Sequence, residues 1–259
     1  MSDEAKTQQA VPARPMIEVV DLHKSFGDNP VLSGINLTVP PGSTCVILGG
    51  SGSGKTVLMK HMIGLLKPDS GQVVVDGEDV VPLGERELER VRRKFGMVFQ
   101  AAALFDSMTV YENVSFPLRE HSKMKEEQVR EVVRAKLAIV GLRNVESKFP
   151  ADLSGGMRKR VGLARAIVLD PKIVLYDEPT TGLDPITTDY VDEMILDAKR
   201  ELGVTSVVIS HDVASAFKVA DNIAFLFQGR IVDQGPPARL RDSQHPQVKV
   251  FLQTWFGKN

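Results

Sequence analysis

A glycine-rich segment that follows an apolar run contains the residue types that bind phosphate groups. It reads Gly49-Gly50-Ser51-Gly52-Ser53-Gly54-Lys55-Thr56 and fits the pattern G-x-x-x-x-G-K-[ST]. Glycines allow positive φ angles and close approach, so successive backbone N–H groups can surround a triphosphate. We expect Lys55 to reach the β- and γ-phosphates and Thr56 to bind Mg²⁺. The segment therefore predicts an ATP and Mg²⁺ site, against the alternative of a glycine-rich linker.

Two acidic residues, Asp177 and Glu178, come directly after the apolar run Ile173 to Tyr176. The carboxyl ends of parallel strands face the ligand crevice of an open α/β sheet. We expect Asp177 to bind Mg²⁺ and Glu178 to polarise the water that attacks the γ-phosphate. Taken alone, such a pair is more typical of a solvated turn, and it is the glycine-rich segment that favours the catalytic interpretation.

One histidine, His211, follows the apolar run Val207 to Ser210 and is predicted to lie at the same sheet edge, where it would contact the γ-phosphate. The other four histidines lack such a placement, and we interpret them as structural or surface residues: His23, His61, His121 and His245.

A second possible anion-binding segment is Leu153-Ser154-Gly155-Gly156-Met157, which precedes a helical pattern over residues 158–168. A serine and two glycines that open a helix offer backbone N–H groups and the positive end of the helix dipole.

Short apolar strands alternate with helices along most of the chain, which favours a parallel sheet covered on both faces. The predicted strands are 17–20, 35–39, 45–48, 72–75, 173–176, 204–210 and 223–227. The predicted helices are 55–63, 126–140, 158–168 and 187–202. In the last helix we expect Tyr190, Val191, Met194, Ile195 and Leu202 to face inward.

The overall composition suits one α/β domain that carries a subdomain, at 259 residues. The 32 basic and 33 acidic side chains give a net charge of -1, so we expect no nucleic-acid partner. The single cysteine, Cys45, excludes an internal disulfide, and we expect it in the core. No stretch reaches the roughly 18 apolar residues of a membrane span. Residues 1–15 are polar and predict a disordered leader.

Together these motifs, in this order from about Ile17 to Gly235, resemble the ABC-type ATPases. The resemblance implies an α/β P-loop NTPase: a RecA-like parallel sheet core with an antiparallel β subdomain and an inserted helical signature subdomain. It implies a single ATPase domain at 16–259, with the core at about 16–99 and 167–259 and the helical subdomain at about 100–166. It also implies ATP hydrolysis that is coupled to transport.

The resemblance assigns further residues. Phe26 looks like the aromatic residue that stacks on adenine, and Gln100 like the glutamine that senses Mg²⁺ and the attacking water. Residues 181–184 look like the segment that places Asp184 at the partner's ATP. In this family two copies pair head to tail, so Ser154, Gly155, Gly156 and Asp184 would contact ATP held by a second copy. Met157 and Gly50 depart from the common signature glutamine and P-loop proline, and we expect catalysis to survive both changes.

A finer resemblance, to the Mla/Mce group of lipid-trafficking ABC ATPases, rests on residues 103–110, 113–121 and 182–187. It implies phospholipid transport between inner and outer membranes, a transmembrane permease, an Mce-domain substrate-binding protein and a STAS-domain protein. The chain would then lie at the cytoplasmic face of the inner membrane, held there by the permease. We expect a groove with Leu104, Phe105 and Met108 to accept a permease helix, and no long extension after Trp255.

Three alternatives stay open at this point: an ABC ATPase for another substrate, a soluble ABC ATPase that acts on DNA or ribosomes, and a module that uses ATP only to dimerise. A single cassette without a coiled coil or zinc cysteines disfavours the second, and the intact Glu178 and His211 disfavour the third.

Overall fold

The computed structural model describes residues 14–100 and 102–256. Most of the predicted leader, residues 1–13, lies outside the described residues. The Arg14 guanidinium donates a hydrogen bond to the Gly77 carbonyl at 2.6 Å, so this residue contacts the folded domain.

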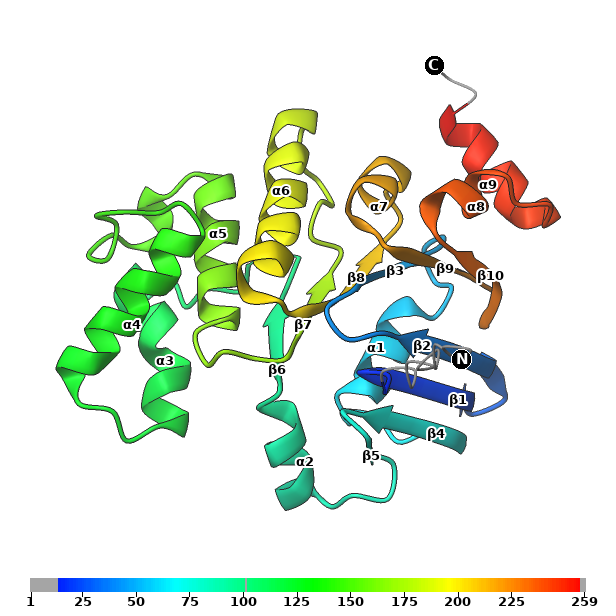
Figure 1. Cartoon of the computed structure of the whole chain (residues 1–259), viewed down its shortest axis with the longest axis horizontal. Coiled ribbons are helices and arrows are strands. Elements are labelled where there is room, and N and C mark those ends of the chain that lie inside the picture. Colours follow the sequence, from blue (N-terminus) through cyan, green and yellow to red (C-terminus); the bar gives the residue numbers. More distant parts are fainter. Residues whose placement is uncertain (1–13, 101, 257–259) are drawn as a thin grey trace, which may run out of the picture.

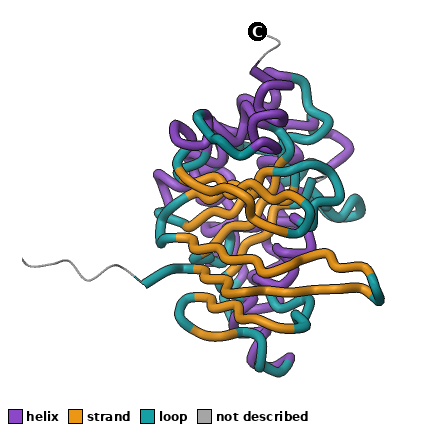
Figure 2. The backbone as a smooth tube through the Cα atoms, turned by 90° about the vertical axis from the view of Figure 1, so that its right-hand side faces the viewer, coloured by secondary structure: helices purple, strands orange, loops and turns teal. Residues whose placement is uncertain are grey.

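Two sheets form the centre of the molecule (Figures 1 and 2). A four-stranded antiparallel sheet has the order β2-β1-β4-β5, and a six-stranded sheet has the order β10-β9-β3-β8-β7-β6. Strands β9, β3, β8, β7 and β6 are parallel, and β10 is antiparallel to β9. The strands are β1 (Ile17–Phe26), β2 (Asn29–Val39), β3 (Thr44–Leu48), β4 (Ser70–Val75), β5 (Glu78–Asp79), β6 (Phe95–Val98), β7 (Ile173–Asp177), β8 (Thr205–Ser210), β9 (Asn222–Phe227) and β10 (Arg230–Gly235).

The helices lie on both sides of the parallel strands, and α3, α4 and α5 stand together at one end of the molecule (Figure 1). They are α1 (Lys55–Met62), α2 (Glu85–Arg92), α3 (Val110–His121), α4 (Glu126–Ile139), the 3₁₀ helix η1 (Pro150–Asp152), α5 (Gly155–Ala166), α6 (Pro185–Leu202), α7 (Val213–Val219), α8 (Pro237–Arg241) and α9 (Pro246–Phe256). Within residues 14–100 and 102–256, no helix combines the length and the apolar composition that crossing a membrane requires.

Side chains of the parallel strands alternate between two hydrophobic cores, as the pleat of a strand requires. Cys45 and Ile47 of β3 pack in the core shared with α1, α2 and the antiparallel sheet. Their neighbours Val46 and Leu48 pack in the core on the opposite face, which is covered by α5, α6 and α7. The sheet is therefore buried on both faces, as the continuous apolar runs predicted, and Cys45 is fully buried.

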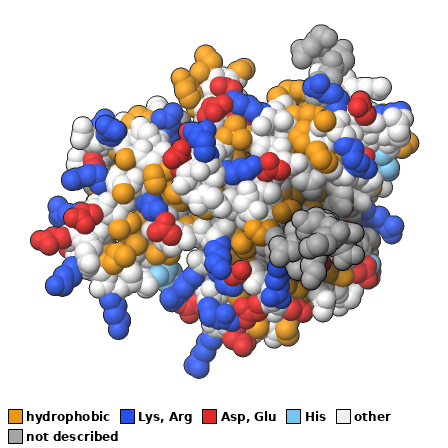
Figure 3. Space-filling model, in the orientation of Figure 1, with side chains coloured by type: hydrophobic (Ala, Val, Ile, Leu, Met, Phe, Trp, Pro, Cys, Tyr) orange, Lys and Arg blue, Asp and Glu red, His pale blue; other side chains and the backbone are white. Residues whose placement is uncertain are grey.

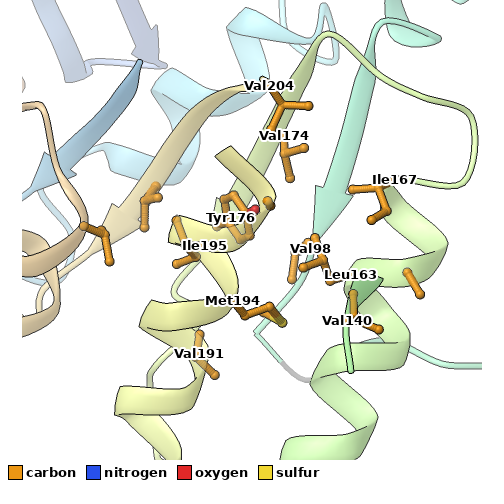
Figure 4. Packing of buried hydrophobic residues seen from close by; sticks show 14 of the residues in the cluster. Val98, Val140, Leu163, Ile167, Val174, Tyr176, Val191, Met194, Ile195 and Val204 are labelled. Carbon is orange, nitrogen blue, oxygen red and sulfur yellow. The ribbon is translucent and has the colours of Figure 1, made fainter. Parts of the chain in front are cut away.

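The core that contains Val46 and Leu48 also joins helices α3, α4 and α5 to the sheet (Figure 4). Tyr176 of β7 lies between Ile195 of α6 and Val98 of β6, and Leu163 and Ile167 of α5 approach from the other side. This shared core fixes α5 and α6 relative to the end of β7. Each helix then presents its first turn at the same side of the molecule, the top in Figure 1.

Each predicted strand and helix overlaps an observed one, but one predicted core position is wrong. Tyr190 of α6 is 55% exposed, and the guanidinium of Arg160 lies 5.6 Å from its ring centroid. Val191, Met194 and Ile195 are buried as expected, and Leu202 is half-buried. The apolar stripe of α6 is narrower than the sequence pattern suggested because the aromatic ring packs beside α5 at the surface.

Candidate functional site

The glycine-rich loop connects β3 to α1 and needs glycine at particular positions. Gly52 and Gly54 have φ angles of 74° and 104°, which side-chain-bearing residues rarely adopt. A Cβ atom on Gly49 would lie 2.3 Å from the Leu226 carbonyl oxygen. At Gly50, in contrast, nothing lies within 4 Å of such an atom. The loop thus requires glycine at positions 49, 52 and 54, whereas a Cβ atom at position 50 would meet open space.

This loop forms one wall of a cavity of about 620 Å³. The remaining lining side chains come from β2, the segment after β6, the ends of β7 and β8, and helix α9. The lining residues are Val31, Gly50, Ser51, Gly52, Ser53, Gly54, Lys55, Thr56, Val57, Gln100, Glu178, Thr181, His211 and Phe251. The structure therefore brings together the glycine-rich loop, Gln100, Glu178 and His211 as the sequence predicted.

A buried ammonium group lies inside the loop. Lys55 is 6% exposed, and its Nζ donates to the carbonyls of Gly49 and Gly50 at 2.9 and 3.0 Å. The same Nζ lies 3.4 Å from Oε1 of Glu178. A positive charge held at this position can bind an anionic phosphate group that enters the cavity.

Asp177 and Thr56, the two residues predicted to bind Mg²⁺, lie within hydrogen-bond distance of each other. Burial and the neighbouring Glu178 charge raise the pKa of Asp177, while the hydrogen bond with Thr56 and the charge of Lys55 oppose that shift. Among the described residues, no group of three or more His, Cys, Asp or Glu side chains could hold a metal ion. A hydroxyl beside one carboxylate fits Mg²⁺, which takes oxygen ligands and shares its coordination with substrate phosphates.

Glu178 is held from several sides. His211 Nδ1 lies 2.6 Å from its Oε2, and the Thr181 hydroxyl donates to the same oxygen at 2.9 Å. The Glu178 backbone has a φ of 49°, a strained conformation for a residue with a side chain, and its N–H donates to the Ile209 carbonyl at 3.0 Å. The carboxylate is 19% exposed at the cavity wall. It is thus positioned to accept a proton from a water molecule in the cavity.

Phe26 is not among the residues that line this cavity. It ends β1, is 49% exposed, and has Lys24 Nζ 5.6 Å from its ring centroid. The sequence reasoning missed three lining residues, Val31, Val57 and Phe251, and it named Thr181 only as part of the segment 181–184. Phe251 stacks edge-on against Phe225 at 5.0 Å. No sequence motif marks it, because α9 reaches the cavity only through the tertiary fold.

The predicted second anion-binding segment is not part of the cavity. Ser154 is the N-cap of α5, and its side chain accepts a hydrogen bond from the Met157 N–H at 3.2 Å. In Figure 1, α5 lies apart from α1, with β7 and α6 between them. Added Cβ atoms at Gly155 and Gly156 would come no closer than 3.9 Å to another atom, so this chain itself does not require glycine there.

Asp184 also lies outside the cavity, at the start of α6. Its carboxylate caps the helix by accepting from the N–H groups of Ile186 and Thr187, both at 3.0 Å. Figure 3 shows hydrophobic side chains gathered over the projecting end of α6, where Ile186 is 69% exposed.

A separate groove of about 540 Å³ lies between α2, β6, α3 and α5. Phe105 and Phe116 lie on its wall with ring centroids 5.2 Å apart, and Arg93 and Arg165 also line it. Of the three residues predicted here, only Phe105 lines the groove. Leu104 instead packs against the core, and the Met108 carbonyl accepts a hydrogen bond from buried Asn113 at 3.1 Å.

Comparison with known proteins gives one matching family model, described as ABC transporter, over residues 32–181. The chain is 46% identical over 94% of its length to the probable ribonucleotide transport ATP-binding protein mkl of Mycobacterium tuberculosis (strain ATCC 25618 / H37Rv), of which it covers 68%. It is 40% identical over 92% of its length to the intermembrane phospholipid transport system ATP-binding protein MlaF of Haemophilus influenzae (strain ATCC 51907 / DSM 11121 / KW20 / Rd), of which it covers 90%.

Among solved structures, the chain resembles the ATP-binding cassette MJ0796, determined as a dimer in a post-hydrolysis state with ADP and Pi. The TM-score is 0.76 and the sequence identity is 31%. The match covers 86% of this chain and 99% of that one.

Proposed function

Because the chain belongs to the ABC transporter family and is its ATP-hydrolysing subunit, we propose that two copies bind two ATP molecules at their interface and drive phospholipid transport between inner and outer membranes through a separate permease. The observation that carries the catalytic part is the contact of His211 with Glu178 at the wall of the cavity formed by the glycine-rich loop.

The head-to-tail dimer is supported by the glycines of the signature segment. Gly155 and Gly156 occupy open positions with no steric need for glycine within this chain. A phosphate group of ATP held by a second copy would approach these backbone positions closely, which explains why both are glycine. The cassette MJ0796, which this chain resembles, was determined as a dimer.

In the proposed mechanism, the loop N–H groups and Lys55 bind the phosphates, and Thr56 and Asp177 would hold Mg²⁺, which would supply positive charge to neutralise the phosphates. Gln100 lies at the same cavity and would contact the metal and the water. Glu178 accepts the proton of the attacking water, and His211 orients Glu178 through their hydrogen bond. Ser154, Gly155, Gly156 and Asp184 of the second copy would complete the enclosure. Phe26 lies outside the cavity but is half exposed, and its ring could stack on the adenine ring in place of its contact with Lys24.

Phospholipid is favoured as the substrate by the match to MlaF, which extends over 90% of that protein. The match to mkl, a probable ribonucleotide transport protein, supports the second candidate, an ABC ATPase for another substrate. The cavity formed by the glycine-rich loop is assigned to ATP, so we propose that partner chains select the transported molecule.

The groove beside α3 supports docking of a permease helix. Phe105 and Phe116 offer an apolar surface. Arg165, whose guanidinium donates to the uncharged carbonyls of Ala102 and Ala103, gives one edge a positive charge, whereas Arg93 is paired with Glu89 on the same wall. We infer that the entering helix is apolar in the middle and acidic at an end. Such docking would hold the chain at the cytoplasmic face of the inner membrane. An Mce-domain substrate-binding protein and a STAS-domain protein would complete the assembly.

Affinity purification of the tagged chain from detergent-solubilised membranes tests this proposal. A membrane-spanning partner and bound phospholipid, identified by mass spectrometry, are expected with the native chain. The Phe116→Glu variant should lose both, whereas Val250→Glu, a change at a 61% exposed residue of α9, should retain them. Recovery of the native chain without any membrane partner would contradict the proposal, and a bound ribonucleotide other than an adenine nucleotide, in place of lipid, would favour the second candidate.

A further inference from the structure

We propose that Lys159 is a positioning residue that links the signature helix α5 to Glu178 of the same chain, and so couples the two ATP sites of the dimer. This inference rests on the proposed head-to-tail dimer.

Lys159 is an almost fully buried cation with an uncharged partner. It lies in α5, is 7% exposed, and its Nζ donates a hydrogen bond to the Pro179 carbonyl. Within the described part of the chain, no carboxylate forms an ion pair with it. Burial accordingly lowers the pKa of its ammonium group. Burying a charge without a counter-charge is energetically unfavourable, so the burial of the Lys159 ammonium group against the Pro179 carbonyl lowers the stability of the fold.

Another buried lysine shows how such a charge is ordinarily compensated. Lys136 of α4 is 8% exposed and forms an ion pair with Asp170. Both lysines lie in helices beside β7 with similar burial, but Lys136 bonds Asp170 before that strand, whereas Lys159 bonds Pro179 directly after Glu178. Lys136 is therefore a matched control for removal of a buried ammonium group.

The acceptor of Lys159 is the residue directly after Glu178. The strained Glu178 backbone is fixed on one side by its N–H contact with Ile209 and on the other by the Thr181 N–H, which donates to the Glu178 carbonyl at 3.3 Å. Lys159 fixes the next carbonyl along the chain. A displacement of α5 would therefore pull on the peptide segment that sets the direction of the Glu178 carboxylate.

The two ends of this link serve different ATP molecules. Lys159 lies about one helical turn after Ser154, Gly155 and Gly156, which in the proposed dimer contact ATP held by the second copy. Glu178 faces the cavity of its own chain. A helix moves as a rigid body over one turn, so closure of the signature segment at one site would reach Glu178 at the other. Lys159 thus transmits movement of the signature helix at one ATP site to Glu178 at the other.

Steady-state ATPase assays of the full-length chain test the role of the charge. Lys159→Met should lower kcat about tenfold or more while leaving the Kd for ATP within about twofold, since Lys159 touches no part of the cavity. Lys159→Arg, which can still donate to the Pro179 carbonyl, should recover most of the activity. The control Lys136→Met should keep the native kcat. A Lys159→Met enzyme with the kcat of Lys136→Met would overturn the proposal.

Mixed dimers distinguish coupling from simple support of the signature helix. Two differently tagged copies are co-expressed and purified in two steps, and one of them carries Glu178→Gln so that a single site turns over. Lys159→Met is then placed either in the copy with the active Glu178 or in the other copy. Because every such dimer carries one Lys159→Met chain, a general loss of stability affects both placements equally.

The proposal requires the larger loss of turnover, about fivefold or more, when the change is in the copy with the active Glu178. An equal loss in both placements, or a larger loss in the other placement, overturns it. Failure of the proposed head-to-tail dimer is recognised separately, because the two differently tagged copies would then not be recovered together in the two-step purification.

Discussion

Nδ1 of His211 lies 2.6 Å from Oε2 of Glu178, which joins the ends of the neighbouring strands β7 and β8. This contact places an imidazole and a carboxylate at the wall of one cavity, opposite the buried Lys55 ammonium group. The carboxylate is therefore oriented before any substrate enters. Catalysis of phosphoryl transfer depends on such positioning and charge more than on covalent chemistry.

Replacing Glu178 with Gln should leave ATP affinity nearly unchanged and lower kcat by roughly 10²-fold or more, because an amide cannot accept the proton of the attacking water. The measurement is single-turnover hydrolysis of labelled ATP alongside equilibrium binding. Glu193→Gln, on the surface of α6, is the control and should keep native turnover. Native turnover in the Glu178 variant would refute the role assigned to this residue.

Replacing Gly49 with Ala should destabilise the domain by about 1–3 kcal/mol, since the new methyl group would lie 2.3 Å from the Leu226 carbonyl oxygen. Gly50→Ala is a matched control in the same loop, where the methyl group meets open space. Thermal melting of both variants checks this expectation. Equal melting temperatures for the two would show that the β3–β9 contact is more compliant than the structure indicates.

A buried carboxylate in α6 should give the fold a measurable pH dependence. Asp192 is 3% exposed and accepts a hydrogen bond from Ser215 of α7. Burial raises its pKa to about 6, with Asp189 and Asp212 adding to the shift and Lys218 and the Ser215 hydroxyl opposing it. Because the folded pKa exceeds the ordinary value of 3.8, the folded state binds the proton more tightly. Stability from this group is therefore present at low pH and declines as the pH rises through 6.

Asp192→Asn keeps an oxygen acceptor for Ser215 and cannot ionise. Its unfolding free energy, relative to the native chain, should increase by about 1.4 kcal/mol between pH 5 and pH 8. Urea unfolding at the two pH values provides the measurement. A difference between the two proteins that does not change with pH would mean that Asp192 ionises normally in the folded state.

The local motifs were predictable from sequence because each of them consists of consecutive residues. The loop from Gly49 to Thr56 and the two acids at the end of the 173–176 run need only a strand before them, and the apolar runs supply it. The groove could not be predicted in full, since Phe116 and Arg165 meet Phe105 only after α3 and α5 pack together.

The sequence also did not reveal which of several side chains would be buried, exposed or part of the cavity wall. Lys159 stands in a basic stretch that reads as a solvated helix face, yet tertiary packing buries it against Pro179. Tyr190 fits the apolar stripe of α6 but lies at the surface beside Arg160. Phe251 enters the cavity wall from a helix about 200 residues after the glycine-rich loop, a distance over which periodicity carries no information.

In the proposed dimer, each ATP is enclosed by the glycine-rich loop of one copy and the signature segment of the other. The most direct test of this arrangement is the ATPase activity of a mixture of Ser154→Arg and Lys55→Ala chains. Each variant alone should be inactive, and a mixed dimer should regain turnover at the one site that combines an intact loop with an intact signature segment. Native activity of Ser154→Arg alone, with no gain on mixing, would contradict the account.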